Sequence, residues 1–258
     1  MKSIDYVYEK KGQIRFSANV LKIIAMISML IDHIGFMLIR NGKLYGYDDV
    51  LNNYVSVMPT AKNWVAFYRL CRMIGRISFP IYAFLISEGF FRTNNLFKYI
   101  IRLTVLAIIS EIPYDLMVSN TLFSFYSQNV LWTYVLALIM LAIIDRFREL
   151  PVLQFIIVAF TAFISYLLKT DYNYIGIILI AFYYATCMDK NMRSLGSGII
   201  TFLSSIKNNF GFAACSTFFI HFYDGTKGTF DFGRIFYIFY PLHMLILYAI
   251  VYFSYLIK

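Results

Sequence analysis

An aspartate and a histidine stand side by side inside the first long apolar run of the chain. The run extends from Leu21 to Ile39, and Asp32 and His33 lie in its second half. Histidine titrates near neutral pH, so an imidazole can take a proton from an amine or hydroxyl and return it to a leaving group. A charge at the centre of a bilayer costs roughly 2.5–3.5 kcal/mol on insertion scales, so it is retained where partners or water meet it. The two residues therefore predict a polar chamber inside a membrane protein.

Three further ionisable residues lie in the next two apolar runs, at a comparable predicted depth. Arg76 opens the second run, and Glu111 and Asp115 lie in the third, four positions apart and so on one helical face. Asp32 and His33 are about 100° apart around a helix, so each needs a partner from another helix. Depth favours Arg76 as the partner of Asp32, and Glu111 or Asp115 as the partner of His33. An Asp32–Arg76 pair that only holds two helices together is the structural alternative.

Apolar runs of about 20 residues occupy most of the 258-residue chain. Apolar residues make up 60% of it and charged residues 14%, and the mean hydropathy is +0.66, whereas about a quarter of a soluble domain is charged. Runs of this length can cross a bilayer as helices. We predict an all-α, polytopic integral membrane bundle of about nine transmembrane helices, forming one domain over residues 1–258. The expected spans are 21–39, 74–91, 96–118, 129–145, 153–168, 172–188, 195–206, 210–223 and 234–257.

Lysine and arginine are concentrated in alternate connections between these runs. Residues 1–17 hold four of them and residues 92–102 hold three, whereas residues 119–128 hold none. Because cytoplasmic loops carry the excess of basic residues, this alternation predicts that residues 1–17 form a cytoplasmic N-terminal segment. The longest connection, 42–73, then lies outside the cytoplasm, and we expect residues 63–73 to form an interfacial amphipathic helix.

Several function classes are disfavoured by composition and spacing. The 23 lysines and arginines outnumber the 14 acidic residues, but topology and anionic lipid account for this excess, so bilayer lipid is the expected partner and nucleic acid is not. The three histidines lie in different runs and the three cysteines have no paired spacing, so no metal site is predicted. No P-loop or glycine-rich nucleotide motif is present.

Six segments, in this order and over nearly the whole chain, resemble the TraX family. That family is named for a protein that acetylates the N-terminal amine of conjugative pilin, and it is similar to the wider transmembrane acyltransferases that use acetyl-CoA. The resemblance implies a multi-pass protein of the bacterial inner membrane, with His33 as its catalytic histidine. The segments are LKIIAMISMLIDHIGFML (21–38), IGRISFPIYAFLISEGFFRT (74–93), SEIPYDL (110–116), QNVLWT (128–133), DYNYIGIILI (171–180) and FYIFYPLHMLIL (236–247).

The function that this resemblance implies is acetyl-CoA-dependent acetylation of an amine or hydroxyl on an envelope-associated or secreted acceptor, such as a pilin-like protein or a glycan. His33 is the expected general base, oriented by Glu111 or Asp115, while Arg76 stabilises the oxyanion or fixes Asp32. His243, which follows Pro241, faces either a helix partner or the chamber. The residues assigned to acceptor binding are Asn129, Thr133, Asp171, Tyr172 and His243, and those assigned to the phosphates of CoA are Lys22, Arg92, Lys98 and Arg102.

Two alternatives belong to other classes of protein. A small proton-coupled transporter or flippase could use Asp32, His33, Glu111 and Asp115 as a proton relay, although the sequence shows no two-fold repeat of the kind common in transporters. A non-enzymatic assembly factor would tolerate the replacement of all these residues by apolar ones.

Overall fold

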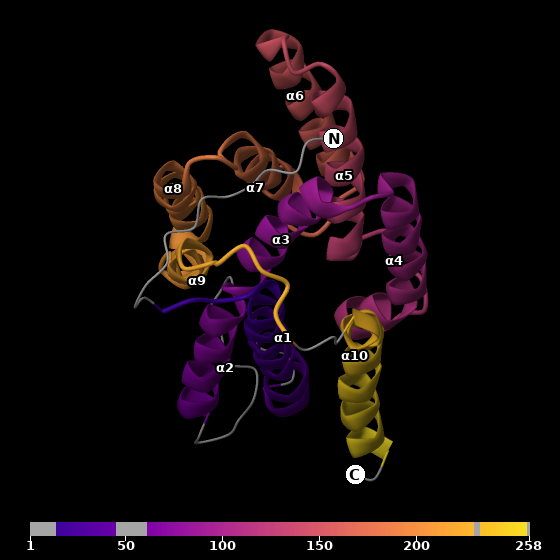
Figure 1. The fold of residues 1–258 in the computed structure, drawn as a ribbon. Coiled ribbons are helices and arrows are strands. Elements are labelled where there is room, and N and C mark those ends of the chain that lie inside the picture. Colours follow the sequence, from indigo (N-terminus) through magenta and orange to yellow (C-terminus); the bar gives the residue numbers. More distant parts are fainter. Residues whose placement is uncertain (1–13, 45–60, 230–232, 257–258) are drawn as a thin grey trace.

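Helices make up the regular structure of the protein in a computed structural model that describes residues 14–44, 61–229 and 233–256 (Figure 1). Within these ranges there is no β-strand, only isolated bridges between Phe16 and Tyr223 and between Gln128 and Thr170. The predicted all-α class is therefore confirmed for the described part of the chain. The α-helices are α1 (Ala18–Ile34), α2 (Ala61–Gly75), α3 (Ser78–Arg92), α4 (Leu96–Ser119), α5 (Val130–Arg146), α6 (Pro151–Leu167), α7 (Asn173–Ala185), α8 (Lys190–Asn209), α9 (Ser216–His221) and α10 (Gly233–Leu256), with a π-helix η1 (Gly35–Lys43) and a 3₁₀-helix η2 (Phe212–Cys215).

Three helical stretches are long and apolar enough to cross a membrane. They are Ala18–Lys43, Lys62–Arg92 and Ile235–Ser254, and further apolar helices of 10–17 residues cover Pro151–Leu167, Asn173–Ala185 and Phe212–His221. The first stretch is longer than the expected span 21–39 because η1 continues α1 without a break. By length and composition, the described residues thus contain three candidate spans.

The helix α1 packs one face against the rest of the protein, and that face carries both apolar and polar side chains. Ser17 caps its start, since the Ser17 hydroxyl accepts a hydrogen bond from the Val20 amide at 3.4 Å. Leu21, Ala25, Ser28 and Asp32 are buried, and their spacing of three or four residues places them along one side of a helix. Asp32 is thus held on the packed face of α1 by the same periodicity that buries its apolar neighbours.

The helix α2 runs beside α1 (Figure 1) and packs one face against α1 and η1. Val65, Tyr68 and Cys71 of α2 pack with Ile39 and Leu44 in a small apolar core. The residues 63–73, predicted to form an interfacial helix, are helical and also fall within the candidate span Lys62–Arg92. Their place at the membrane interface stays a prediction. The charged residues of α2 gave it an amphipathic appearance, but one of its arginines, Arg72, turns inward to Asp32.

The chain bends between α2 and α3, at Arg76 and Ile77. Pro80 is the physical cause, because proline has no amide hydrogen and its ring collides with the carbonyl four residues earlier, here that of Arg76. The break in the helix thus falls one turn before Pro80. After the bend α3 is buried over most of its length and packs against α1, α5, α7 and α9, while α10 packs mainly against α4 (Figure 1).

Candidate functional site

A cavity of about 860 Å³ extends between α1, α3, α4 and α10. The α2–α3 bend, the start of α5 and residues 171–172 complete its wall. Cavities that hold small molecules and cofactors span roughly 300–1,000 Å³, so this one has the size of a ligand site. Its wall carries the ionisable residues of α1 and of the α2–α3 bend at one end, and a group of basic residues at the other.

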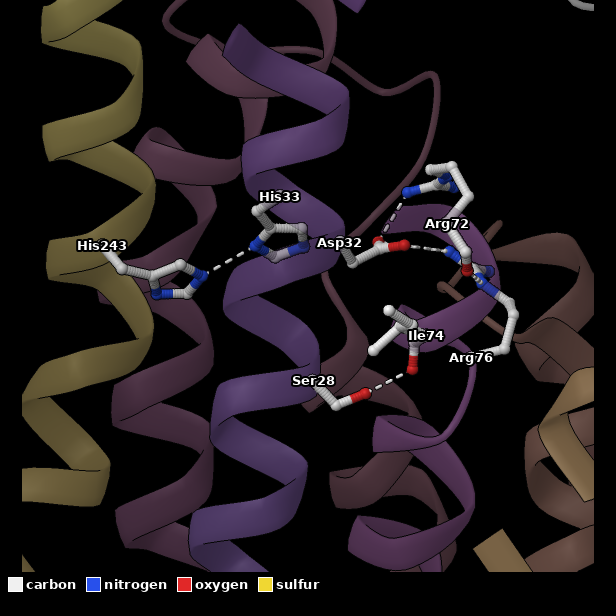
Figure 2. A network of polar contacts seen from close by, with 7 residues as sticks. All are labelled: Ser28, Asp32, His33, Arg72, Ile74, Arg76 and His243. Atoms are coloured by element: carbon white, nitrogen blue, oxygen red, sulfur yellow. Dashed lines mark hydrogen bonds and ion pairs between the residues drawn. The ribbon is translucent and has the colours of Figure 1, made fainter. Parts of the chain in front are cut away.

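The carboxylate of Asp32 is shared by two guanidinium groups (Figure 2). Arg76 Nη2 lies 3.1 Å from Oδ1 of Asp32, and Arg72 Nη1 lies 2.5 Å from Oδ2. The predicted partnership of Asp32 with Arg76 is confirmed. Arg72 was missed, although its position four residues before Arg76, on the same helical face, is a signal that the sequence does contain.

Small groups allow α1 and α2 to approach closely behind this ion pair. Ser28 donates a hydrogen bond to the carbonyl of Ile74 at 2.5 Å, next to the bend (Figure 2). A Cβ atom added to Gly75 would lie 2.2 Å from Oδ1 of Asp32. Glycine is therefore required at position 75 for the carboxylate to reach both arginines.

His33 points away from Asp32, towards α10, where it meets His243 (Figure 2). Nδ1 of His33 lies 2.7 Å from Nε2 of His243, and the two ring planes differ by only 2°. The prediction that Glu111 or Asp115 would orient His33 is therefore wrong, because its hydrogen-bond partner is a second imidazole. Of the two alternatives left open for His243, the structure shows a helix partner.

Glu111 and Asp115 do not line the cavity. Glu111 accepts hydrogen bonds from Trp132 Nε1 at 2.9 Å and from the amide group of Asn129, both near the start of α5. Asp115 accepts one from the Ser124 amide at 2.8 Å, in the loop after α4. The expected single chamber with five ionisable groups thus contains Asp32, His33 and Arg76, and the two carboxylates of α4 connect α4 to its neighbours instead.

Asn129 and Thr133, assigned to acceptor binding, also lie outside the cavity wall and have structural partners. The Asn129 amide group donates to the carbonyl of Ala107 at 2.9 Å, and its oxygen caps α5. The Thr133 hydroxyl donates to the backbone carbonyl of Asp171 and lies 3.1 Å from the hydroxyl of Thr170. Thr133 therefore holds the turn between α6 and α7 in place.

Asp171 and Tyr172, in that turn, do line the cavity. The Tyr172 ring stacks on Phe79 with centroids 3.6 Å apart, and the guanidinium carbon of Arg76 lies 5.9 Å from the Tyr172 ring centroid. Burial raises the pKa of the Asp171 carboxyl, and the nearby positive charge of Arg76 opposes that shift. The acidic side chain is thus placed beside the Asp32–arginine cluster.

Basic residues surround the opposite end of the cavity, which we call the basic mouth and define as Lys22, Arg92, Arg102 and Lys227. Backbone hydrogen bonds position it, since the amides of Ala18 and Asn19 donate to the carbonyls of Thr226 and Lys227. Arg92 Nε lies 3.1 Å from Oε2 of Glu88. Lys98, assigned to the CoA phosphates, lies in a small neighbouring pocket that also contains Arg102.

The donor set of the cavity suits an organic anion better than a metal ion. Within the described ranges, no three histidine, cysteine, aspartate or glutamate side chains come together as metal ligands. Basic side chains at a cavity mouth can bind phosphate groups, and an imidazole in the wall can transfer protons.

One comparison with known proteins covers most of the chain. A family model described as TraX protein matches residues 17–251. A curated relative from Dichelobacter nodosus, named "Probable fimbrial assembly protein FimC, serogroup H1", is 30% identical over 106 residues, which is 41% of this chain. The match spans 34% of that relative's length. No solved structure matches the chain.

Proposed function

The chain belongs to the TraX family, and on that premise we propose that it is a membrane-embedded acyltransferase. The reaction is transfer of the acetyl group of acetyl-CoA to an amine or hydroxyl of an envelope-associated or secreted acceptor. The observation that carries the proposal is the position of His33 in the wall of a cavity whose other end is the basic mouth.

The proposed orientation in the membrane assigns the donor to one end of the cavity and the acceptor to the other. We propose a multi-pass protein of the bacterial inner membrane with about nine spans and a cytoplasmic N-terminus. The basic mouth, at the start of α1 and the end of α3, then faces the cytoplasm, where acetyl-CoA is found. The polar end with Asp32 and Arg76 is reached by an acceptor from the other side.

The length of the cavity suits a donor that carries its phosphates far from its reactive atom. Lys22 and His33 are eleven residues apart on α1, so they are separated by about 16 Å along the helix axis. Apolar and aromatic side chains such as Met29, Leu103 and Tyr237 line the stretch between. A donor with phosphates at the basic mouth would present its thioester near His33.

His33 acts as general base in the proposed reaction. Its imidazole takes the proton from the attacking amine or hydroxyl as the new bond to the acetyl carbon forms. The carbon–sulfur bond then breaks, and the thiolate of CoA receives that proton from the imidazolium, so no further reactant is needed. Acetylated acceptor and free CoA are the products.

Arg72 and Arg76 supply positive charge where the transition state becomes negative. A positioned guanidinium stabilises a developing oxyanion, and Asp32 keeps the two groups fixed beside the cavity. Asp171 and Tyr172, next to Arg76, are in position to contact the acceptor. The name of the relative from Dichelobacter nodosus, a probable fimbrial assembly protein, makes a pilin-like protein the first acceptor to examine.

Purified protein in proteoliposomes, supplied with acetyl-CoA labelled in its acetyl group, tests the proposal. We expect release of the free CoA thiol together with movement of label to an acceptor in envelope extract or, without extract, slowly to water. Liposomes without protein are the control. Saturable uptake of a solute or protons with intact acetyl-CoA would instead support a transporter that uses Asp32 and His33 as a relay.

A further inference from the structure

We propose that His243 fixes the tautomer of His33, so that the proton of the His33 ring stays on Nδ1 and the lone pair on Nε2 serves as the base. The tautomer assignment stands on hydrogen-bond geometry alone, whereas its role in catalysis rests on the proposed function. His243 is thus a positioning residue that acts through His33.

The chain of hydrogen bonds has a direction because it ends on a backbone carbonyl. Nδ1 of His243 lies 2.7 Å from the carbonyl oxygen of Phe239. A carbonyl can only accept, so Nδ1 of His243 carries a hydrogen and donates it. Nε2 of a neutral His243 is then without hydrogen and accepts from Nδ1 of His33, which lies 2.7 Å away. The remaining nitrogen of His33, Nε2, is left as the base.

The His243 ring is held by packing on its own helix. His243 is 5% exposed, and its ring stacks on Phe239 with centroids 4.5 Å apart and an interplanar angle of 7°. The Tyr240 ring meets it edge-on at 6.0 Å. Because these contacts come from α10 itself, the orientation of His243 does not depend on His33.

A base needs the correct tautomer before it can act. With the hydrogen on Nε2, the imidazole of His33 would present a donor to the acceptor molecule and could not take its proton. In serine hydrolases a carboxylate on the other ring nitrogen of the catalytic histidine prevents this. Here a neutral imidazole has that position, and it can also share the positive charge of the imidazolium that forms during the reaction.

The charged and titratable groups around His33 come from several elements. Asp32 of α1 points the opposite way, to Arg72 of α2 and Arg76 at the α2–α3 bend (Figure 2), and Tyr114 of α4 lines the same cavity. In the neutral pair the one free lone pair is that of Nε2 of His33, because the other three ring nitrogens donate or accept within the hydrogen-bond chain. The first extra proton taken up by the pair therefore occupies the base itself, and activity should fall at acid pH as that first proton binds.

Nitrogen-15 NMR of histidine-labelled protein in lipid nanodiscs tests the assignment without any turnover. The three histidine signals are identified by their loss in His33→Gln, His221→Gln and His243→Phe variants. In the wild-type protein at pH 8 we expect His33 to carry its hydrogen on Nδ1, and in His243→Phe we expect the signal of the Nε2–H form to appear. A wild-type His33 with its hydrogen on Nε2 would overturn the proposal, even if the protein proves to be an acetyltransferase.

Turnover tests the catalytic role. With acetyl-CoA as the probe and thiol release as the readout, His243→Phe should lower kcat by about 100-fold or more, with KM for acetyl-CoA unchanged. His243→Gln, whose amide oxygen can accept from Nδ1 of His33, should recover much of that loss. His243→Glu should move the acid limb of the pH profile to higher pH, because a carboxylate stabilises the imidazolium.

The outcomes separate the two proposals. Equal activity of folded His243→Phe and His243→Gln would refute the positioning role. Absence of turnover in the wild-type protein, together with an Nδ1–H tautomer for His33, would refute the proposed function and leave the tautomer assignment standing.

Discussion

Asp32 and Arg76, 44 residues apart in the sequence, meet at 3.1 Å where α1 passes the bend between α2 and α3. The bend follows from Pro80, and the close approach follows from Gly75, so two residues without charge determine where the charges meet. The same turn of α1 directs His33 to the other side, towards α10. One helical turn thus carries both the carboxylate of the ion pair and the proposed base.

Replacing Asp32 by Asn should destabilise the protein, because two partly buried guanidinium groups lose their counter-charge. Breaking a buried ion pair on one side costs about 3–5 kcal/mol, and we expect the lower end because the Arg72 and Arg76 side chains are 27% and 19% exposed. The thermal unfolding midpoint in detergent measures the effect. Asp145→Asn is the matched control, since its partner Arg148 is 60% exposed and the loss should be about 1 kcal/mol or less. Equal midpoints for the two variants would refute the buried role.

Gly75→Ala should separate α1 from α2. The added methyl group would lie 2.2 Å from Asp32 Oδ1, and overpacking of this kind costs about 1–3 kcal/mol. Gly198→Ala is the control in α8, because its new Cβ would find its nearest neighbour, Thr217, at an ordinary 3.5 Å. Unfolding midpoints should fall for the first variant only. A Gly75→Ala protein as stable and active as wild type would show that the close packing is not needed.

The basic mouth should set the affinity for the donor. Changing Lys22 and Arg102 together to Gln removes two charges from the cavity wall, and each hydrogen bond to a charged group contributes about 1.5–3 kcal/mol. We expect KM for acetyl-CoA to rise at least about tenfold, with kcat little changed and a weaker dependence on salt. Arg148→Gln, exposed and outside the cavity, should leave KM unaltered. A higher KM in the control alone would contradict this assignment.

Thr133→Val should loosen the turn that carries Asp171 and Tyr172. The variant loses the hydroxyl contacts to the Asp171 carbonyl and to Thr170, and an unsatisfied buried group costs about 1–3 kcal/mol. Turnover should fall together with stability. Thr161→Val, which loses only a bond to the carbonyl of Ile157 in its own helix, should keep its turnover. The same rate in both variants would mean that the turn has no part in the reaction.

The sequence was sufficient to predict the helical class and the Asp32–Arg76 pair, because hydropathy gives the depth of each residue in a span. It did not give the direction in which a residue faces. Glu111 and Asp115 have the expected depth, but the rotation of α4 turns them towards Asn129, Trp132 and the following loop. His33 therefore could not be matched to a carboxylate from depth alone.

The contact between His33 and His243 joins residues 210 positions apart. It depends on the packing of α10 beside α1 and α4, which periodicity cannot supply. The sequence did contain one signal for this contact, since both histidines lie in long apolar runs and each needs a polar partner there. Arg72 was missed for a different reason, since the charged residues around it made α2 resemble a surface helix.

The most direct measurement of the central claim compares thiol release from acetyl-CoA by wild-type, His33→Ala and His221→Ala proteins in the same proteoliposomes. Unlike His33, His221 does not line the cavity, and it contacts the hydroxyl of Ser194. We expect His33→Ala to lose about 10²–10⁴-fold in rate, while it elutes as a monodisperse protein, and His221→Ala to keep the wild-type rate. Wild-type turnover by a folded His33→Ala protein would contradict the account.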